Sequence, residues 1–329
     1  MKLCTFEVST SVGKHWRLGA LTARGIIDLN FACAWHLRRK GEARPYALAN
    51  VLVPDTMLEY LRGDRTSAGF AAATLGAIED AASSGEVPTG LNGETLIYNP
   101  GDVRLRAPLH NPESFRNFSA LRQHVRTVSQ KRLEPIPAEG REMPVYANVA
   151  ARSIIGPGED VPWPRSTERW DYGLEIACVV GRPGRDIDAA SAAEHIAGYT
   201  ILNHFSARDI QGAQTGTRLA QARGEDWASA IGPVLVTPDE IADPYRLRMT
   251  ARINGEVWSE ETTASLPWRF EQMIEFLSRD DEVRAGDLVG SGIVGGGCGQ
   301  EIDRWIGPGD VIELEIEKIG VLRNRVVRQ

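Results

Sequence analysis

Two short segments of this 329-residue chain concentrate side chains that can move protons or hold an oxyanion. The first reads DYGLEI over 171–176 and contains Glu175, while the second reads NHFSARDIQ over 203–211 and contains His204 and Arg208. Apolar residues flank Glu175, so on a strand its carboxylate points inward and needs a partner, for which Arg208 is the natural candidate. An imidazole, a carboxylate and a guanidinium in one pocket are suited to acid–base chemistry.

The composition and net charge limit the kinds of molecule that this protein is expected to bind. With 42% hydrophobic residues, the chain can bury a large core and form two domains of ordinary size. The net charge is −7 and Lys and Arg form no extended block, so we expect a small-molecule substrate rather than nucleic acid or a membrane. The four cysteines are widely separated, and no segment resembles a signal peptide or a membrane helix, so we expect reduced thiols and a cytoplasmic location.

Residues 1–105 are expected to form a small β-containing N-terminal domain. Alternating apolar residues predict strands at 3–8, 17–22 and 25–29. Helical patterns follow at 28–36, 54–61 and, in an alanine-rich stretch, 68–84.

Residues 106–329 are expected to form a larger domain that is richer in strands. β-rich runs bounded by Gly, Pro or Asp occur at 174–181, 232–236, 247–254, 287–290 and 311–316. The Asn254–Gly255 pair predicts a two-residue type I′ hairpin, because both residues tolerate positive φ. Helices are expected at 189–195 and 270–279.

The region from about 106 to 325 resembles the fumarylacetoacetate hydrolase family, through several separated segments in the family's order. In that family an acidic DYExEL strand and an NDxSARDxQ segment hold a divalent metal. The resemblance implies a mostly β, α/β chain whose C-terminal domain is a rolled mixed β-sandwich, and usually a homodimer. The matching segments are FRNF (115–118), QHV (123–125), SIIGPG (153–158), DYGLEI (171–176), AGYT (197–200), NHFSARDIQ (203–211), IGP (231–233), INGE (253–256), AGDL (285–288) and PGDV (308–311).

Four positions match the family's apparatus. The resemblance implies that His124 polarises water, that Glu175 is a metal ligand, and that Arg208 and Gln211 face the substrate. In the family, Mg²⁺ or Ca²⁺ grips the oxygens of a 1,3-dicarbonyl or 2-oxo acid while a carbon–carbon bond breaks. A hard dication needs several oxygen ligands for this work.

Five positions depart from the family pattern, and all five fall on the site. Asn117 and His204 replace aspartates, Gly173 replaces a glutamate, Glu225 replaces a lysine and Ile293 replaces a threonine. This set lacks the carboxylates that Mg²⁺ prefers, so we expect no metal. The alternative is a mixed site of Asn117, Glu175 and His204, suited to Mn²⁺ or Zn²⁺ rather than Mg²⁺.

The leading hypothesis is acid–base chemistry on a β-dicarbonyl, 2-oxo acid or related enolisable molecule. The reaction would be carbon–carbon hydrolysis, decarboxylation, tautomerisation or cyclisation. His124 and His204 would move protons, Glu175 would orient an imidazole, and Glu225 is a further acid or base. Arg208 would hold an oxyanion.

The predicted substrate-binding residues are Arg208, Gln211, Arg116, Asn117 and Ile293. Arg208 and Arg116 suit a substrate carboxylate through bidentate contacts. The glycines at 295–297 lack the Lys-Ser/Thr of a phosphate loop, so we expect a turn that approaches the pocket.

Two alternatives remain open from the sequence. The first is a metal-dependent acylpyruvate-type hydrolase that uses Asn117, Glu175 and His204. The second is a catalytically silent paralogue that binds a ligand or a partner. Substitution of His124 or His204 by alanine separates the silent paralogue from either enzyme, because an enzyme would lose about 10²-fold in rate.

Overall fold

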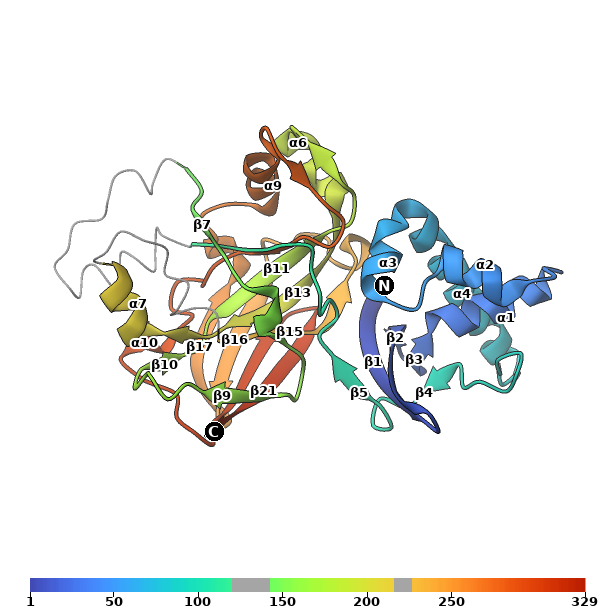
Figure 1. Cartoon of the computed structure of the whole chain (residues 1–329), viewed down its shortest axis with the longest axis horizontal. Coiled ribbons are helices and arrows are strands. Elements are labelled where there is room, and N and C mark those ends of the chain that lie inside the picture. The colour runs from blue at the N-terminus through green and yellow to red at the C-terminus, as the bar shows by residue number, and fades with distance from the viewer. Residues whose placement is uncertain (120–142, 216–226, 329) are drawn as a thin grey trace.

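The computed structural model describes residues 1–119, 143–215 and 227–328. Strands dominate it, and the sheets are mixed, which confirms the mostly β, α/β fold class. Figure 1 shows the helices of the N-terminal part on one side of the molecule and the strand-rich part on the other.

A large sheet of 12 strands runs through both parts of the chain. Its main path has the order β4-β3-β2-β1-β15-β13-β11-β19-β6-β7, and two further strands, β5 and β8, pair with β1 and β15. The bounds along the path are β4 Ile97–Tyr98, β3 Gly25–Asp28, β2 Gly13–Thr22, β1 Lys2–Thr10, β15 Ser229–Val236, β13 Ile196–His204, β11 Leu174–Val180, β19 Leu288–Gly290, β6 Phe115–Phe118 and β7 Tyr146–Asn148, with β5 Arg104–Arg106 and β8 Ile154–Ile155 beside it.

The junction between the two parts is a strand pair. β1 lies antiparallel to β15, with Leu3 opposite Leu235, so the N-terminal strands extend the sheet of the larger part. Because one sheet contains strands from both parts, it does not test the domain boundary at 105/106, which stays a prediction.

The N-terminal helices pack on one face of the sheet. The sequence patterns predicted α1 (Leu29–Arg39), α3 (Met57–Arg62) and α4 (Asp64–Ser83), but not α2 (Pro45–Leu52). Asp28 begins α1 by accepting a hydrogen bond from the Phe31 N–H. An apolar layer joins these helices to the sheet, and includes Leu29, Leu37, Met57, Leu202 and Leu235.

A second sheet of five strands packs on the other face and forms a sandwich with the first. Its order is β17-β16-β20-β21-β9, and a large buried core fills the space between the sheets. Figure 1 shows β21 of this sheet beside β15. The bounds are β17 Glu256–Thr262, β16 Arg248–Ile253, β20 Val311–Ile316, β21 Gly320–Arg328 and β9 Asp160–Trp163.

The predicted hairpin is confirmed. Ile253 lies opposite Glu256, and the two residues between them have positive φ, 53° at Asn254 and 82° at Gly255. Positive φ at both positions is the geometry of a type I′ turn, which suits the twist of the paired strands.

Short elements complete the larger part. Two small sheets are β10 (Trp170–Asp171) with β14 (Ser206–Ala207), and β12 (Gly184–Arg185) with β18 (Glu282–Val283). The helices are α6 Ala189–Ala192, α7 Arg208–Thr215, α9 Phe270–Ser278 and α10 Gly299–Ile302, and the 3₁₀ turns are η2 Ala151–Ser153, η3 Ala193–His195, η4 Pro238–Glu240 and η5 Thr263–Ser265.

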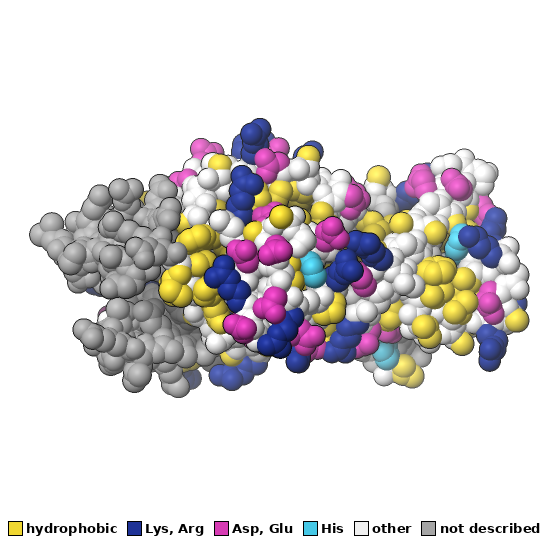
Figure 2. All heavy atoms as spheres, turned by 90° about the horizontal axis from the view of Figure 1, so that it is seen from above, with side chains coloured by type: hydrophobic (Ala, Val, Ile, Leu, Met, Phe, Trp, Pro, Cys, Tyr) yellow, Lys and Arg dark blue, Asp and Glu magenta, His cyan; other side chains and the backbone are white. Residues whose placement is uncertain are grey.

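The surface carries charges of both signs. On the face that Figure 2 shows, acidic and basic side chains are interspersed and neither sign forms a large patch. Within the described residues, no helix is both long and apolar enough to cross a membrane.

Candidate functional site

One face of the large sheet carries Asn117, Glu175, His204 and Ser229. Side chains of directly opposed residues, and of residues two apart on a strand, point to the same face. This face continues the apolar layer under the N-terminal helices, whereas the opposite face lines the sandwich core. The register that aligns the four residues is Asn117 opposite Gly290, Gly290 opposite Ala177, Glu175 opposite Leu202, and His204 opposite Ser229.

Gly173 is the point on which three parts of the site converge. A Cβ atom at this position would lie 2.9 Å from Glu175 Oε1, 3.0 Å from the carbonyl oxygen of His204 and 3.2 Å from Ile293 Cγ1. The Glu175 carboxylate therefore lies against the space that a side chain at 173 would enter. Ile293 is held there because its glycine-rich loop pairs with Leu174, which donates to the carbonyl of Gly297 at 2.9 Å.

His204 is buried, with 4% of its surface exposed, and its ring is fixed on one side. Nδ1 lies 3.0 Å from Ser229 Oγ, which in turn lies 3.4 Å from Ser153 Oγ. Nε2 is buried and makes no hydrogen bond within the described part of the chain. Burial, and then the positive charge of Arg208, lowers the pKa of His204 to about 3, so the imidazole is neutral near pH 7.

Arg208 is held in a fixed orientation by a buried carboxylate. Its Nε donates to Asp171 Oδ2 at 2.9 Å, and its Nη1 donates to Gln211 Oε1 at 2.9 Å. Asp171 is fully buried and also accepts from the backbone N–H groups of Gly299, at 2.8 Å, and Gln300, at 3.2 Å. These contacts aim one guanidinium, 6% exposed, from the start of α7.

Asn117 and Arg116 point to opposite faces of β6. Asn117 is buried, and its Oδ1 accepts from the Gly292 N–H at 3.3 Å, at the edge of the loop that carries Ile293. Arg116 instead forms an ion pair with Asp287, at 3.3 Å, and donates to Ser114 at 2.9 Å. The structure thus groups Asn117 with Glu175 and His204, and does not place Arg116 with them.

Two predicted catalytic residues, His124 and Glu225, lie outside the described residues. Their roles stay predictions. The roles of Glu175, His204, Arg208, Gln211, Asn117, Ile293 and Arg116 are likewise predictions, to which the structure adds the positions given above.

The donor set of the described site does not fit a hard dication. It contains one carboxylate, Glu175, one amide and one neutral imidazole, whereas Mg²⁺ and Ca²⁺ take several oxygen ligands. Position 173 offers no side chain at all. Across the described ranges, no three His, Cys, Asp or Glu side chains are grouped as metal ligands, so the described residues would offer a zinc-type site only Glu175 and His204 as strong donors.

The sequence reasoning missed two residues that hold the site. Asp171 belongs to the DYGLEI segment, but nothing in the sequence indicates that it is the partner of Arg208. Ser229 stands between two alanines and has no sequence signal; only the pairing of β13 with β15 places it against His204.

Comparison with known proteins supports the resemblance. A family model described as fumarylacetoacetate (FAA) hydrolase C-terminal matches residues 113–327. The Bos taurus protein named oxaloacetate tautomerase FAHD2A, mitochondrial, is 27% identical over 328 residues, which cover 99% of this chain and 92% of that protein. The Xenopus laevis protein named oxaloacetate tautomerase fahd2, mitochondrial, is 30% identical over 246 residues and 73% of each chain.

Solved structures have the same fold. The fumarylacetoacetate hydrolase of Exiguobacterium antarcticum superposes with a TM-score of 0.69 at 24% identity, over 99% of this chain and 100% of that chain. The maleylpyruvate hydrolase of Sphingobium sp. SYK-6 gives a TM-score of 0.66 at 21% identity, over 100% of both chains. The family model spans most of the strand-rich part and includes Asn117, Glu175, His204 and Arg208. This chain belongs to the fumarylacetoacetate hydrolase family.

Proposed function

We propose that this enzyme interconverts the keto and enol forms of a small 2-oxo or β-dicarbonyl acid by proton transfer. The chain is an enzyme of the isomerase or hydrolase type, since its relatives include proteins named oxaloacetate tautomerase. The observation that carries the proposal is the buried, neutral His204, which shares a sheet face with Glu175. His204 also lies close enough to Arg208 for the positive charge of the guanidinium to lower its pKa.

His204 acts in this proposal as a neutral hydrogen-bond donor. A pKa of about 3 leaves almost no imidazolium near pH 7, so the ring cannot serve as a cationic acid. The Ser153 hydroxyl donates a hydrogen bond to Ser229 Oγ. The Ser229 hydroxyl is therefore free to donate its own proton to His204 Nδ1. The ring proton then sits on Nε2, where it can bond a substrate carbonyl oxygen.

Arg208 and Glu175 complete the reaction. Arg208 is aimed by Asp171 and stabilises the oxygen that becomes an enolate. Glu175 takes the proton from the substrate carbon next to that carbonyl, and returns it to the enolate oxygen to give the enol. No atom is gained or lost, because the carbon–hydrogen bond that breaks is replaced by an oxygen–hydrogen bond.

The other predicted residues keep supporting roles. Gln211 accepts a hydrogen bond from Arg208, and Asn117 and Ile293 line the approach to Glu175. His124 and Glu225 remain predicted acid–base groups, which alanine substitutions of each can test.

The proposal is tested by following the enol of oxaloacetate by its ultraviolet absorbance, with purified full-length enzyme. Wild type should accelerate interconversion, and His204→Gln should lower kcat by about 10²-fold while the protein stays folded. An unchanged rate in His204→Gln would remove His204 from the mechanism. No acceleration with oxaloacetate or other 2-oxo acids, in wild type, would overturn the proposed activity itself.

A second candidate is a carbon–carbon hydrolase that uses Mn²⁺ or Zn²⁺. It is favoured by one observation, the common face of Asn117, Glu175 and His204. It predicts that an acylpyruvate is cleaved into two acids only after metal is added. Product analysis by NMR separates the two candidates, because tautomerisation leaves the carbon skeleton intact.

The assembly and location of the protein stay predictions. The family resemblance leads us to expect a homodimer, and light scattering of the purified chain measures its mass in solution. We also keep the expectation of a cytoplasmic protein, which fractionation of the source cells can check.

A further inference from the structure

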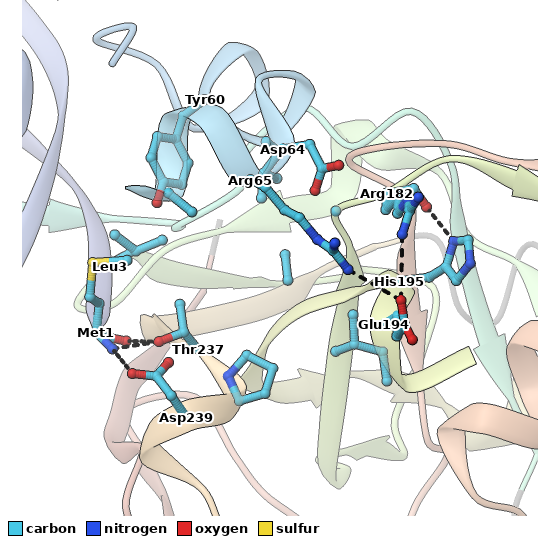
Figure 3. A pocket seen from close by; sticks show the side chains of 16 residues that line it. Met1, Leu3, Tyr60, Asp64, Arg65, Arg182, Glu194, His195, Thr237 and Asp239 are labelled. Atoms are coloured by element: carbon cyan, nitrogen blue, oxygen red, sulfur yellow. Dashed lines mark hydrogen bonds and ion pairs between the residues drawn. The ribbon is translucent and has the colours of Figure 1, made fainter. Parts of the chain in front are cut away.

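A cavity lies far from His204, where the N-terminal part meets the strand-rich part. Its volume is about 250 Å³, and its walls come from β1, α3, α4, the start of β13 and the segment after β15 (Figure 3). β13 connects the two places, with Ile196 at the cavity and His204 eight residues further along. At about 3.3 Å per residue, the two ends are roughly 25 Å apart.

Apolar side chains form much of the cavity wall, and the Tyr60 hydroxyl on this wall has no hydrogen-bond partner among the described residues. Leu3, Leu61, Ile196 and Ala197 form its walls. The hydroxyl of Tyr60 points into the hollow from α3 in Figure 3. Tyr60 is only 4% exposed, and its hydroxyl makes no hydrogen bond within the described residues.

A buried hydroxyl without a partner is unfavourable, so this group indicates a missing acceptor. Burial, with a smaller effect of the Asp239 carboxylate, raises the pKa of Tyr60 above its ordinary value. The phenol therefore keeps its proton and offers it as a donor.

The mouth of the cavity already holds one carboxylate oxygen between two guanidinium groups. Arg65 Nη2 lies 3.2 Å from Glu194 Oε2, and Arg182 Nη1 lies 3.5 Å from the same oxygen (Figure 3). Each guanidinium has further N–H donors to offer. Asp64 and Asp239 also line the cavity, and the Asp239 carboxylate is paired with the N-terminal ammonium of Met1 at 3.5 Å.

We propose that this cavity binds a short aliphatic oxo acid, separately from the catalytic site. The ligand carboxylate takes the place of Glu194 between Arg65 and Arg182. Its ketone oxygen accepts the hydrogen bond from Tyr60, and its methylene groups pack on Leu61 and Ile196. The site is separate from the proposed reaction, because Ile196 lies roughly 25 Å along β13 from His204.

The test uses three matched probes with the full-length protein: 4-oxopentanoate, pentanoate, which lacks the ketone, and 2-pentanone, which lacks the carboxylate. Methyl NMR follows Leu61 and Ile196 in the cavity, and Ile293 as a reporter of the catalytic site. We expect 4-oxopentanoate to shift the Leu61 and Ile196 signals saturably, with each of the other probes binding about fivefold more weakly. No saturable shift at Leu61 and Ile196, or equal binding of all three probes, would overturn the proposal.

Variants test the assigned contacts. Tyr60→Phe removes only the hydroxyl, so it should weaken 4-oxopentanoate about fivefold and leave pentanoate unchanged. Arg65→Gln should weaken both acids and leave 2-pentanone unchanged. Arg65 is 73% exposed, so this variant is expected to fold even if Tyr60→Phe does not.

The matched control is Arg24→Gln, which removes an exposed arginine paired with Glu79 outside the cavity. It should change the affinity of no probe. Equal affinities of wild type and Arg65→Gln for 4-oxopentanoate would refute the role of the guanidinium groups, and with it the recognition of an acid.

Discussion

Replacing Ser229 by alanine removes the one described contact that fixes His204 Nδ1. Ser229 is fully buried, and its Oγ lies 3.0 Å from that nitrogen. The buried Nδ1 then loses its partner, which destabilises the fold by about 1–3 kcal/mol. The ring also loses the bond that keeps its proton on Nε2, and a loss of about 1.4 kcal/mol of transition-state stabilisation lowers kcat about tenfold.

The assays separate the structural effect from the catalytic one. Urea unfolding measures stability, the oxaloacetate enol assay gives kcat and KM, and ¹⁵N NMR of the imidazole reports which nitrogen carries the proton. KM should change little, because Ser229 supports the far side of the ring from the substrate. Ser229→Thr, which keeps the hydroxyl, should recover most of kcat if the added methyl group is accommodated.

Ser278→Ala is the matched control. Ser278 is also fully buried, and its hydroxyl accepts from the Ile187 N–H at 3.0 Å, away from the site. It should lose a similar amount of stability with no change in kcat. A normal kcat and an unchanged imidazole tautomer in Ser229→Ala would show that Ser229 does not fix the proton of His204.

Three further predictions follow from the same contacts. The pKa of His204 is about 3 in the folded protein, against 6.5 for an ordinary histidine. As the pH falls below about 6.5, the unfolded chain binds a proton at His204 that the folded protein does not bind, so the folded state loses stability. Urea unfolding should show wild type losing about 1.4 kcal/mol more than His204→Gln between pH 7.5 and 5.5; equal losses would mean that His204 is not buried and neutral. Asp171→Asn removes the counter-charge of Arg208 and should destabilise by about 3 kcal/mol, whereas Glu256→Gln, in an exposed pair with Arg304, should change stability by less than about 1 kcal/mol; similar effects of the two would contradict the buried pair. Gly173→Glu places a Cβ atom 2.9 Å from Glu175 Oε1 and should displace that carboxylate, lowering kcat at least about tenfold in the enol assay; wild-type activity would show that Glu175 needs no open space at 173.

Local signals in the sequence were sufficient for much of the fold. The turn at Asn254–Gly255 depends on two adjacent residues that accept positive φ, and the structure confirms it. The order of separated segments likewise identified the family of the strand-rich part, which the family model confirms. In contrast, α2 (Pro45–Leu52) was missed, because a short helix of this kind is stabilised by packing against α1 rather than by its own pattern.

The site was harder to predict, because its contacts join residues far apart in the chain. Arg208 was a candidate partner of Glu175 in the sequence, and that pairing stays a prediction. The sequence did not indicate that Arg208 also pairs with Asp171, which comes within reach through the pairing of β10 with β14. Ser229 faces His204 only because β13 and β15 pair in one particular register. A shift of one residue in that register would turn the serine to the other face. Partners such as Asp171 and Ser229 are set by the sheet topology, so neither residue type nor spacing in the sequence predicts them.

Whether the reaction runs without a metal is decided by the rate of enol–keto interconversion of oxaloacetate by metal-stripped enzyme, in the presence and absence of added Mn²⁺ and Zn²⁺. If His204, Glu175 and Arg208 carry the reaction, the stripped wild type should keep its full rate, the metals should not raise it, and His204→Gln should lose about 10²-fold. A stripped enzyme that is inactive until Mn²⁺ or Zn²⁺ is restored would rule out metal-free proton transfer and would favour the metal-dependent alternative at Asn117, Glu175 and His204.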